Sequence, residues 1–167
     1  MSERYIVFKS DLDDIYIGAK DNYIVGLFIG KAEFLEWKKE KDVEKAEDDP
    51  LLKEAALQVK EYIRGERKEF QLPLRLNGTP FQKAVWNALL QIPYGETKSY
   101  QEIAVAIGNP KAVRAIGQAN KANPISIIVP CHRVIGKNGH LTGYAGSRTD
   151  LKAKLLQIEN VGFENKM

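Results

Sequence analysis

The 167-residue chain is poor in the residues that build metal sites and disulfide bonds: it has one cysteine, Cys131, and two histidines, His132 and His140. A single cysteine cannot form a disulfide within the chain, and such usage is typical of a reducing cytoplasm. One cysteine and two histidines without paired spacing also make a poor zinc set. We therefore expect no bound metal and a cytoplasmic protein.

The chain also lacks a long apolar segment. No apolar run approaches the roughly 18 residues that a membrane-spanning helix needs. Residues 1–9 show neither an apolar stretch behind a basic start nor a small-residue cleavage site, so we expect no signal peptide and no membrane contact. Hydrophobic residues still make up 44% of the chain, which is enough for a core.

Acidic residues are scarce in the second half. From Pro80 to the end there are 11 Lys and Arg against 5 Asp and Glu, whereas residues 1–79 hold 14 against 17. A basic half suits a polyanionic partner, because cations that contact phosphates release counterions and supply affinity independent of sequence. Charge alone also permits an ordinary solvated surface.

The first third of the chain predicts a small sheet. β-Branched and aromatic runs occupy Tyr5–Phe8, Ile15–Gly18 and Tyr23–Phe28, and Asp and Asn clusters separate them. This pattern predicts an antiparallel meander. The densely charged segment Lys38–Asp49 predicts a solvated loop or helix face without chemistry, and the apolar spacing in Leu51–Arg64 predicts a helix.

Start signals for helices mark the second half. Thr79 followed by Pro80 predicts the start of one helix, and Ser99 with Glu102 forms a capping box for another. Asn109 can cap a further helix that has Pro110 in its first turn and runs over Lys111–Lys121. Two short helices joined by a tight turn fit a helix-turn-helix or an ordinary helical hairpin about equally well.

The second helix of this pair carries small residues. We expect Val113, Ile116 and Gly117 to face inward, and one long cation, Arg114, to stand among small neighbours. Major-groove readers present several Arg, Asn or Gln side chains to base edges. Small residues around one long side chain instead favour minor-groove binding with a single inserted residue.

An apolar run, Ile125–Val129, predicts a buried strand and leads into Pro130-Cys131-His132-Arg133-Val134. This string resembles the active-site signature of the O6-alkylguanine-DNA alkyltransferases. The resemblance extends from Phe81 to about Gly162, and further matching residues are Ser99-Tyr100-Gln101, Gly108-Asn109-Pro110-Lys111, Arg114-Ala115 and Asn123-Pro124. The first third fits the family only in general character, as a small sheet domain.

The resemblance implies an α+β protein. A small N-terminal antiparallel-sheet domain with a helix would occupy residues 1–78. A mainly helical C-terminal domain with a helix-turn-helix and an active-site loop would occupy residues 79–167 and bind DNA. The implied activity is DNA repair by direct reversal: Cys131 takes the alkyl group from O6-alkylguanine in double-stranded DNA, with O4-alkylthymine a further candidate. We expect a monomer that binds the minor groove.

A thioether has no easy leaving group, and the chain has no second cysteine to resolve it. We therefore expect a methyltransferase that acts irreversibly, once per molecule and without a cofactor.

The chemistry of Cys131 requires help with its proton. An unperturbed thiol has a pKa of about 8.5, so only a few per cent is thiolate at pH 7, and a buried apolar setting reduces that fraction. His132 is the candidate base, but neighbours on an extended segment point to opposite sides, so a bridging water is the simpler geometry. The resemblance places Glu159 as the residue that orients His132.

The resemblance also assigns binding roles. Arg114 would fill the gap that a flipped guanine leaves in the duplex, and Tyr100 would crowd a phosphate and offer its hydroxyl to the base. The other implied substrate residues are Asn123, Val134, Tyr144 and Ala145, and the other implied DNA contacts are Lys111, Ala115 and Gln118. Many relatives have Ser where Ala145 stands, which leaves the preference for bulky adducts open.

Two readings from other classes remain open. A non-catalytic regulator could use the same helix pair to bind DNA, in which case undamaged DNA would bind tightly and with sequence preference. A cysteine hydrolase could be built on Cys131 and His132, in which case an ester or peptide would be turned over. Taken without the resemblance, Tyr100, Arg114, Asn123 and Tyr144 are ordinary packing, surface or turn residues.

Overall fold

The computed structural model describes residues 3–136 and 149–161, and it divides into two compact units. Unit 1 comprises Met1–Asn77 together with Pro124–Ile128, and unit 2 comprises Gly78–Asn123 together with Val129–Met167. The predicted site residues Tyr144 and Ala145, and the second histidine, His140, lie outside the described residues. No helix in the described ranges is long and apolar enough to cross a membrane.

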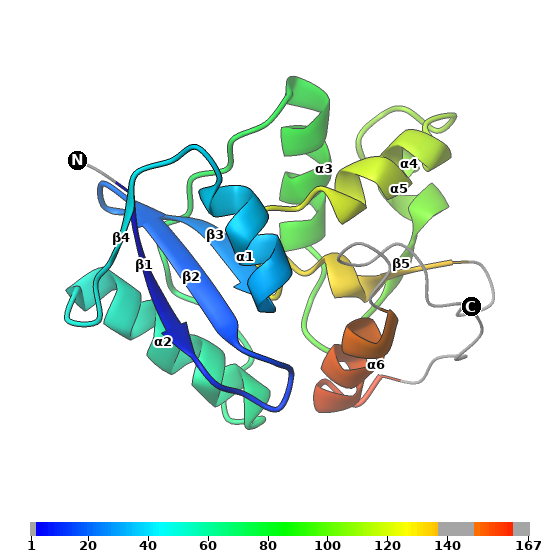
Figure 1. The fold of residues 1–167 in the computed structure, drawn as a ribbon. Helices are drawn as coiled ribbons and strands as arrows, with labels where there is room; N and C mark the ends of the chain where they lie inside the picture. Colours follow the sequence, from blue (N-terminus) through cyan, green and yellow to red (C-terminus); the bar gives the residue numbers. More distant parts are fainter. Residues whose placement is uncertain (1–2, 137–148, 162–167) are drawn as a thin grey trace. The chain divides into compact units, whose positions relative to one another are not determined.

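Unit 1 is built on a four-stranded sheet in the order β3-β2-β1-β4 (Figure 1). Strands β1 (Glu3–Phe8), β2 (Ile15–Lys20) and β3 (Tyr23–Ile29) form the predicted antiparallel meander. Strand β4 (Val43–Lys45) adds a parallel edge next to β1. The solvated loop or helix face predicted for Lys38–Asp49 is therefore wrong at these three residues. A charged edge strand of three residues is too short to show a repeating pattern of hydrophobic residues.

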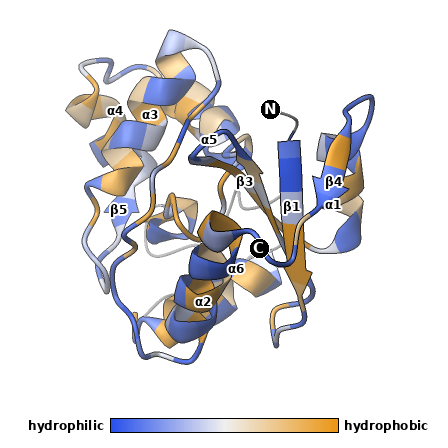
Figure 2. Cartoon of the chain, turned by 90° about the vertical axis from the view of Figure 1, so that its left-hand side faces the viewer, coloured by the Kyte–Doolittle hydropathy of each residue, from blue (hydrophilic) through white to orange (hydrophobic). Residues whose placement is uncertain are grey.

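Two helices cover opposite faces of this sheet (Figure 1). Helix α1 (Lys31–Lys38), which the sequence did not predict, places Phe34 on Tyr16 of β2, with ring centroids 4.2 Å apart and the rings stacked. The alternate residues Ile15 and Ile17 point to the other face. There they meet the amphipathic helix α2 (Pro50–Ile63), which shows both hydrophilic and hydrophobic colours in Figure 2.

A glycine in β2 permits close packing against α1. A Cβ atom placed on Gly18 would lie 2.7 Å from Cη2 of Trp37, which is shorter than carbon atoms tolerate. The Trp37 ring also contacts Phe28, with centroids 5.1 Å apart. Gly18 therefore makes room for the indole over the sheet.

Unit 2 contains four helices among the described residues: α3 (Pro80–Leu90), α4 (Tyr100–Ala106), α5 (Val113–Lys121) and α6 (Thr149–Ile158). Two of the three expected N-terminal caps are present. Thr79 and Gln82 form a capping box at α3, and Ser99 and Glu102 form another at α4. These reciprocal bonds satisfy amide groups that the first helical turn would otherwise leave open.

Helix α5 begins later than predicted. It starts at Val113 after Ala112, which provides no side-chain cap, so the cap predicted for Asn109 is wrong. Asn109 instead follows Gly108, whose φ of 77° ends α4 in a left-handed turn. Val113 is 38% exposed rather than inward-facing, whereas Ile116 is fully buried as predicted.

The segment before Cys131 is buried but is not the predicted strand. Ile125 makes one isolated bridge to Leu27, and the next residues form turns. Ile127 has a φ of 73°, and the amide of Ile128 donates to the carbonyl of Ser126, as in a γ-turn. A β-branched residue rarely adopts this conformation. An apolar run reports burial and does not by itself establish extended backbone.

Candidate active site

Cys131 begins a short 3-10 turn, η1 (Cys131–Arg133), in unit 2. Pro130 precedes it with φ −82° and ψ 64°, and the Cys131 amide donates to the carbonyl of Val129. The backbone here is helical rather than extended, so the predicted extended geometry is wrong. Successive side chains of a 3-10 turn still point about 120° apart around its axis. The side chains of Cys131 and His132 therefore point in different directions.

Two asparagines hold Cys131. The amide of Asn123 donates to Cys131 Sγ at 3.1 Å and to the carbonyl of Val129 at 2.8 Å. The amide of Asn120, at the end of α5, donates to the Cys131 carbonyl at 3.3 Å. Cys131 itself is 1% exposed. A donor directed at the sulfur stabilises its charged form. The structure therefore places Asn123, a predicted substrate residue, in direct contact with the sulfur of Cys131.

His132 and Glu159 form a buried pair. His132 Nε2 lies 2.7 Å from Glu159 Oε2, and neither side chain is exposed. The structure therefore brings together the two residues that were expected to act as base and orienter. Glu159 follows α6 directly, and its amide donates to the carbonyl of Leu155 in the last turn of that helix.

Arg133 and Gly95 fix the Glu159 carboxylate. Arg133 Nε lies 2.9 Å from Glu159 Oε1, and Arg133 Nη2 lies 3.1 Å from Glu159 Oε2. The guanidinium therefore donates two hydrogen bonds to the carboxylate. The Gly95 amide adds a third donor at 3.0 Å. Arg133 Nη1 also donates to the carbonyl of Ile92 at 2.7 Å, which ties this arrangement to the loop after α3.

Burial lowers the pKa of His132, because desolvation outweighs the opposing effect of the Glu159 carboxylate. The nearby cations Arg133 and Lys152 act in the same direction as burial. A neutral imidazole that donates from Nε2 to Glu159 has its acceptor lone pair on Nδ1. That tautomer is the one that can accept a proton from the cysteine side, directly or through water.

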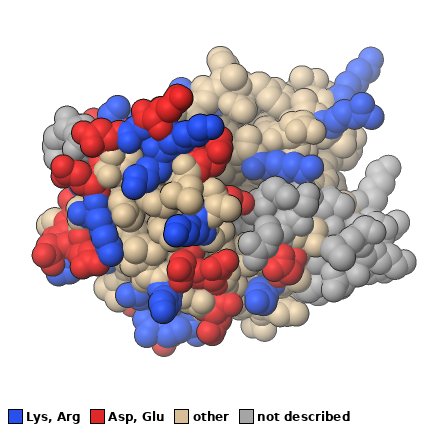
Figure 3. All heavy atoms as spheres, viewed as in Figure 1, with Lys and Arg blue, Asp and Glu red and all other residues tan. Residues whose placement is uncertain are grey.

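The predicted DNA contacts share an exposed surface. Arg114, Ala115 and Gln118 lie on the solvent side of α5, and Lys111 is exposed in the turn before it. In Figure 3 the surface at the α4–α5 end of unit 2, at the upper right, shows Lys and Arg without Asp or Glu. Since Asn120 lies on the buried side of the same helix, α5 connects this surface with Cys131.

Two predicted substrate residues lie near the same turn. Val134 follows η1, is fully buried, and pairs with Lys98 in a two-stranded parallel sheet, β5 (Lys98–Ser99) with β6 (Val134–Ile135). Tyr100 starts α4, half-buried, and its ring centroid lies 5.8 Å from Lys152 Nζ.

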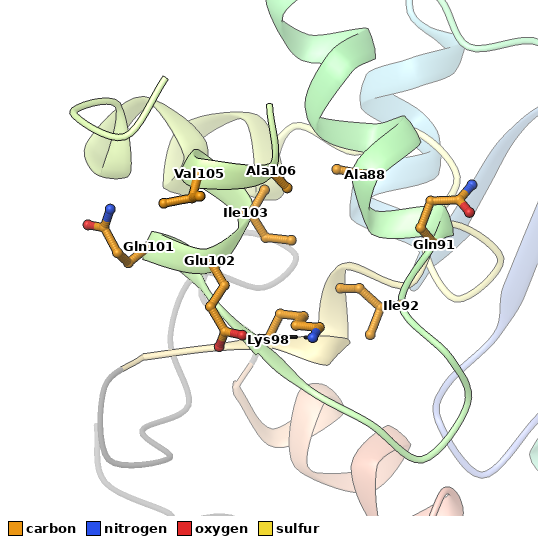
Figure 4. A pocket seen from close by; sticks show the side chains of 9 residues that line it. All are labelled: Ala88, Gln91, Ile92, Lys98, Gln101, Glu102, Ile103, Val105 and Ala106. Atoms are coloured by element: carbon orange, nitrogen blue, oxygen red, sulfur yellow. Dashed lines mark ion pairs between the residues drawn. The ribbon is translucent and has the colours of Figure 1, made fainter. Parts of the chain in front are cut away.

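A hollow of about 450 Å³ lies between α3 and α4 (Figure 4). Its walls include Ala88, Ile92, Ile103 and Val105, with a Lys98–Glu102 ion pair of 3.8 Å at its edge. None of the predicted site residues that the structure describes lines it. The candidate site is therefore defined by the chemistry around Cys131 and not by the size of a hollow.

Sequence reasoning gave no role to four groups that the structure places at the site. These are Asn120, the Arg133 guanidinium, the Gly95 amide and the buried Lys152. The sequence could have pointed to Arg133, because this residue belongs to the Pro-Cys-His-Arg-Val string. The others are distant in sequence from Cys131 or act through backbone atoms, which leave no residue pattern.

The fold and the site together define a class: a protein with a buried cysteine nucleophile, anchored by amide donors, behind an exposed and basic helical surface. Two family models match the chain. "6-O-methylguanine DNA methyltransferase, ribonuclease-like domain" covers residues 4–76, and "6-O-methylguanine DNA methyltransferase, DNA binding domain" covers residues 80–161.

Full-length relatives agree with these models. The chain is 50% identical to the constitutive methylated-DNA–protein-cysteine methyltransferase of Bacillus subtilis, over 97% of this chain and 98% of that protein. It is 48% identical to the methylated-DNA–protein-cysteine methyltransferase of Methanosarcina acetivorans, over 93% and 97%. Mycobacterium tuberculosis OGT, solved in complex with DNA, superimposes with a TM-score of 0.83 at 43% identity, covering 93% and 92%.

The chain belongs to the O6-methylguanine-DNA methyltransferase family. The family expected from the Pro-Cys-His-Arg-Val string is confirmed, and so is the α+β fold.

Proposed function

We propose that this protein repairs DNA directly by transferring the alkyl group of O6-alkylguanine to Cys131, as a methylated-DNA–protein-cysteine methyltransferase. The Sγ thiolate attacks the alkyl carbon and forms a thioether. The bond between that carbon and O6 breaks, its electron pair stays on the guanine, and guanine takes up one proton. The thiol proton leaves through His132, oriented by Glu159.

The observation that carries this proposal is the environment of Cys131. A buried cysteine whose sulfur accepts a hydrogen bond from Asn123 lies beside the His132–Glu159 pair. Of the rival readings, a regulator would need none of these contacts, and the family membership argues against a hydrolase. The thioether has no good leaving group, so the alkylated Cys131 is not restored and each molecule acts once.

The DNA partner follows from the exposed surface of α5. One family relative, Mycobacterium tuberculosis OGT, has been solved with DNA, and Arg114 of this chain stands on α5 among small residues. We infer a minor-groove complex of a monomer in which Arg114 occupies the space of the flipped base, Tyr100 contacts the base and phosphate, and Lys111, Ala115 and Gln118 contact the backbone. Residues 79–167 would carry both binding and transfer.

Further roles complete the proposal. Val134 would offer its carbonyl to the base edge, and Tyr144 and Ala145 would line the base pocket. O4-alkylthymine is a second candidate substrate. The reaction needs a free thiol, which suits a reducing cytoplasm.

Stoichiometry tests the proposal. A duplex containing one O6-methylguanine is titrated with the protein, and the restored guanine is counted per protein molecule. We expect one repaired base per molecule, and none with Cys131→Ala. Repair that continues beyond one equivalent, or that persists in Cys131→Ala, would refute a consumed Cys131. Turnover of a simple ester would support the hydrolase instead.

A further inference from the structure

The C-terminal end of α6 lies directly at the site, because Glu159 is the first residue after this helix. Asn160, the next residue, has a φ of 60°, in the left-handed region that residues with a Cβ atom seldom adopt. Asparagine tolerates this conformation better than most of them. The side chain of Asn160 is exposed, so packing in the core does not account for this residue.

Backbone hydrogen bonds around Asn160 form a Schellman motif. The amide of Val161 donates to the carbonyl of Leu156 at 2.9 Å, and the amide of Asn160 donates to the carbonyl of Gln157 at 3.0 Å. These are the two bonds that close a helix whose chain turns away through a left-handed residue. Val161 also packs against the apolar cluster that contains Leu156, and such a contact commonly accompanies the motif. Helix α6 therefore ends in one defined geometry.

A side chain from the loop after α3 completes this cap. The hydroxyl of Tyr94 donates to the carbonyl of Ile158 at 3.2 Å, and the amide of Glu159 donates to the carbonyl of Leu155 at 3.2 Å. A helix by itself leaves its last four carbonyls without partners. With these bonds and the Schellman motif, each of the last four carbonyls of α6 has a donor, which fixes the backbone on both sides of Glu159.

The position of this backbone decides what the Glu159 carboxylate can reach. Its oxygens lie 2.7 Å from His132 Nε2, 3.0 Å from the amide nitrogen of Gly95 and 2.9 Å from Arg133 Nε. All three groups belong to segments outside α6. Because hydrogen bonds weaken steeply when distance and angle depart from their usual range, the carboxylate meets all three only if the end of α6 presents Glu159 correctly.

We propose that Asn160 is a positioning residue of the transfer reaction. Its left-handed backbone permits the Schellman motif, which holds Glu159 where the carboxylate orients His132 toward the proton of Cys131. Asn160 acts through Glu159 and not on the reacting atoms. Its effect on transfer rests on the proposed function, whereas its effect on the contact between His132 and Glu159 does not.

Three substitutions isolate the backbone conformation. Asn160→Val disfavours a positive φ, because a β-branched residue rarely adopts it, whereas Asn160→Gly adopts it without steric cost. Glu40→Val is the matched control: Glu40 is also exposed and has a φ of 62°, but it lies in the turn after α1, in unit 1. Both Val variants should lower the urea midpoint of unfolding, so a general loss of stability is matched.

The contact between His132 and Glu159 is observed by NMR on protein with 15N-labelled histidine. A strong hydrogen bond from an imidazole N–H to a carboxylate moves the proton signal far downfield. His132→Gln identifies this signal among the two histidines of the chain. We expect the signal in wild type, Asn160→Gly and Glu40→Val, and its loss or broadening in Asn160→Val.

Transfer is measured by single-turnover kinetics on saturating O6-methylguanine duplex, under conditions in which every variant is folded. We expect Asn160→Val to slow transfer at least about tenfold, since a misplacement of about 1 Å can cost about 100-fold in rate. Asn160→Gly and Glu40→Val should transfer at the wild-type rate. The Kd for the duplex, measured with Cys131→Ser added to each variant, should not change, because α5 is not altered.

A folded Asn160→Val variant that keeps either the histidine signal or the wild-type transfer rate would overturn the proposal, and so would equal slowing in Glu40→Val. Asn160→Ala imposes a milder backbone penalty and decides the question in the same two assays if Asn160→Val does not fold. A wild type that shows the histidine signal but does not repair DNA would refute the proposed function, and the signals of the variants then decide on Asn160.

Discussion

Replacing Glu159 by glutamine tests the buried network that orients His132. The carboxylate accepts donors from His132, Arg133 and Gly95, and its side chain has no exposed surface. Glutamine keeps the shape but removes the charge, so the Arg133 guanidinium remains buried opposite a neutral group. Removing one partner of a buried ion pair costs about 3 to 5 kcal/mol. For a chain of this length, that loss lowers the melting temperature by about 6 to 20 °C.

Transfer should slow as well, because an amide, which has one donor and one acceptor, replaces the carboxylate that selects the tautomer of His132. Loss of a positioned general base costs about 100-fold to 10,000-fold in rate. Stability is measured by urea unfolding followed through tryptophan fluorescence, and transfer by single-turnover kinetics on an O6-methylguanine duplex.

A double-mutant cycle separates the ion pair from simple loss of packing. Arg133→Met alone should also destabilise the protein, because it leaves the Glu159 carboxylate buried without its main cation. The double variant should lose at least about 2 kcal/mol less than the sum of the single losses, because no unpaired charge remains. Additive losses, or a Glu159→Gln variant within about 1 kcal/mol of wild type, would refute the reasoning.

Single contacts at His132, Gly18 and Asn123 lead to three more predictions. The lowered pKa of His132 means that the unfolded state binds its proton first, so stability should fall by up to about 1.4 kcal/mol per pH unit as pH drops below about 6.5, and His132→Gln should reduce this slope in urea titrations. Gly18→Ala should destabilise unit 1 by about 1 to 3 kcal/mol, because its Cβ collides with Trp37; an unchanged urea midpoint would contradict this contact. Asn123→Leu should leave the Val129 carbonyl without its donor, costing about 1 to 3 kcal/mol by the same assay, and should slow transfer to Cys131 even on saturating DNA.

Local signals in the sequence were enough for much of the fold. The helix start at Thr79-Pro80 and the capping box of Ser99 with Glu102 are written within a few residues, and the structure contains both. The meander of β1, β2 and β3 follows from β-branched and aromatic runs that short polar turns separate. These signals are readable because each one is complete within a few residues of chain.

Features set by distant contacts could not be read in the same way. The Arg133–Glu159 contact joins residues 26 apart, and Gly95 reaches Glu159 through a backbone amide across 64 residues. The turn at Ile127 looked like a strand because its apolar residues report only burial. Lys152 looked like any surface lysine of a charged helix, whereas the fold leaves it without exposed surface.

The identity of the alkylated atom tests the proposed mechanism most directly. The protein is incubated with a duplex that carries isotopically labelled O6-methylguanine, digested, and its peptides are mapped by mass spectrometry. We expect one labelled methyl group per molecule, on the sulfur of Cys131, and restored guanine in the duplex. A label on any other residue, or a repaired duplex with unmodified Cys131, would contradict the mechanism.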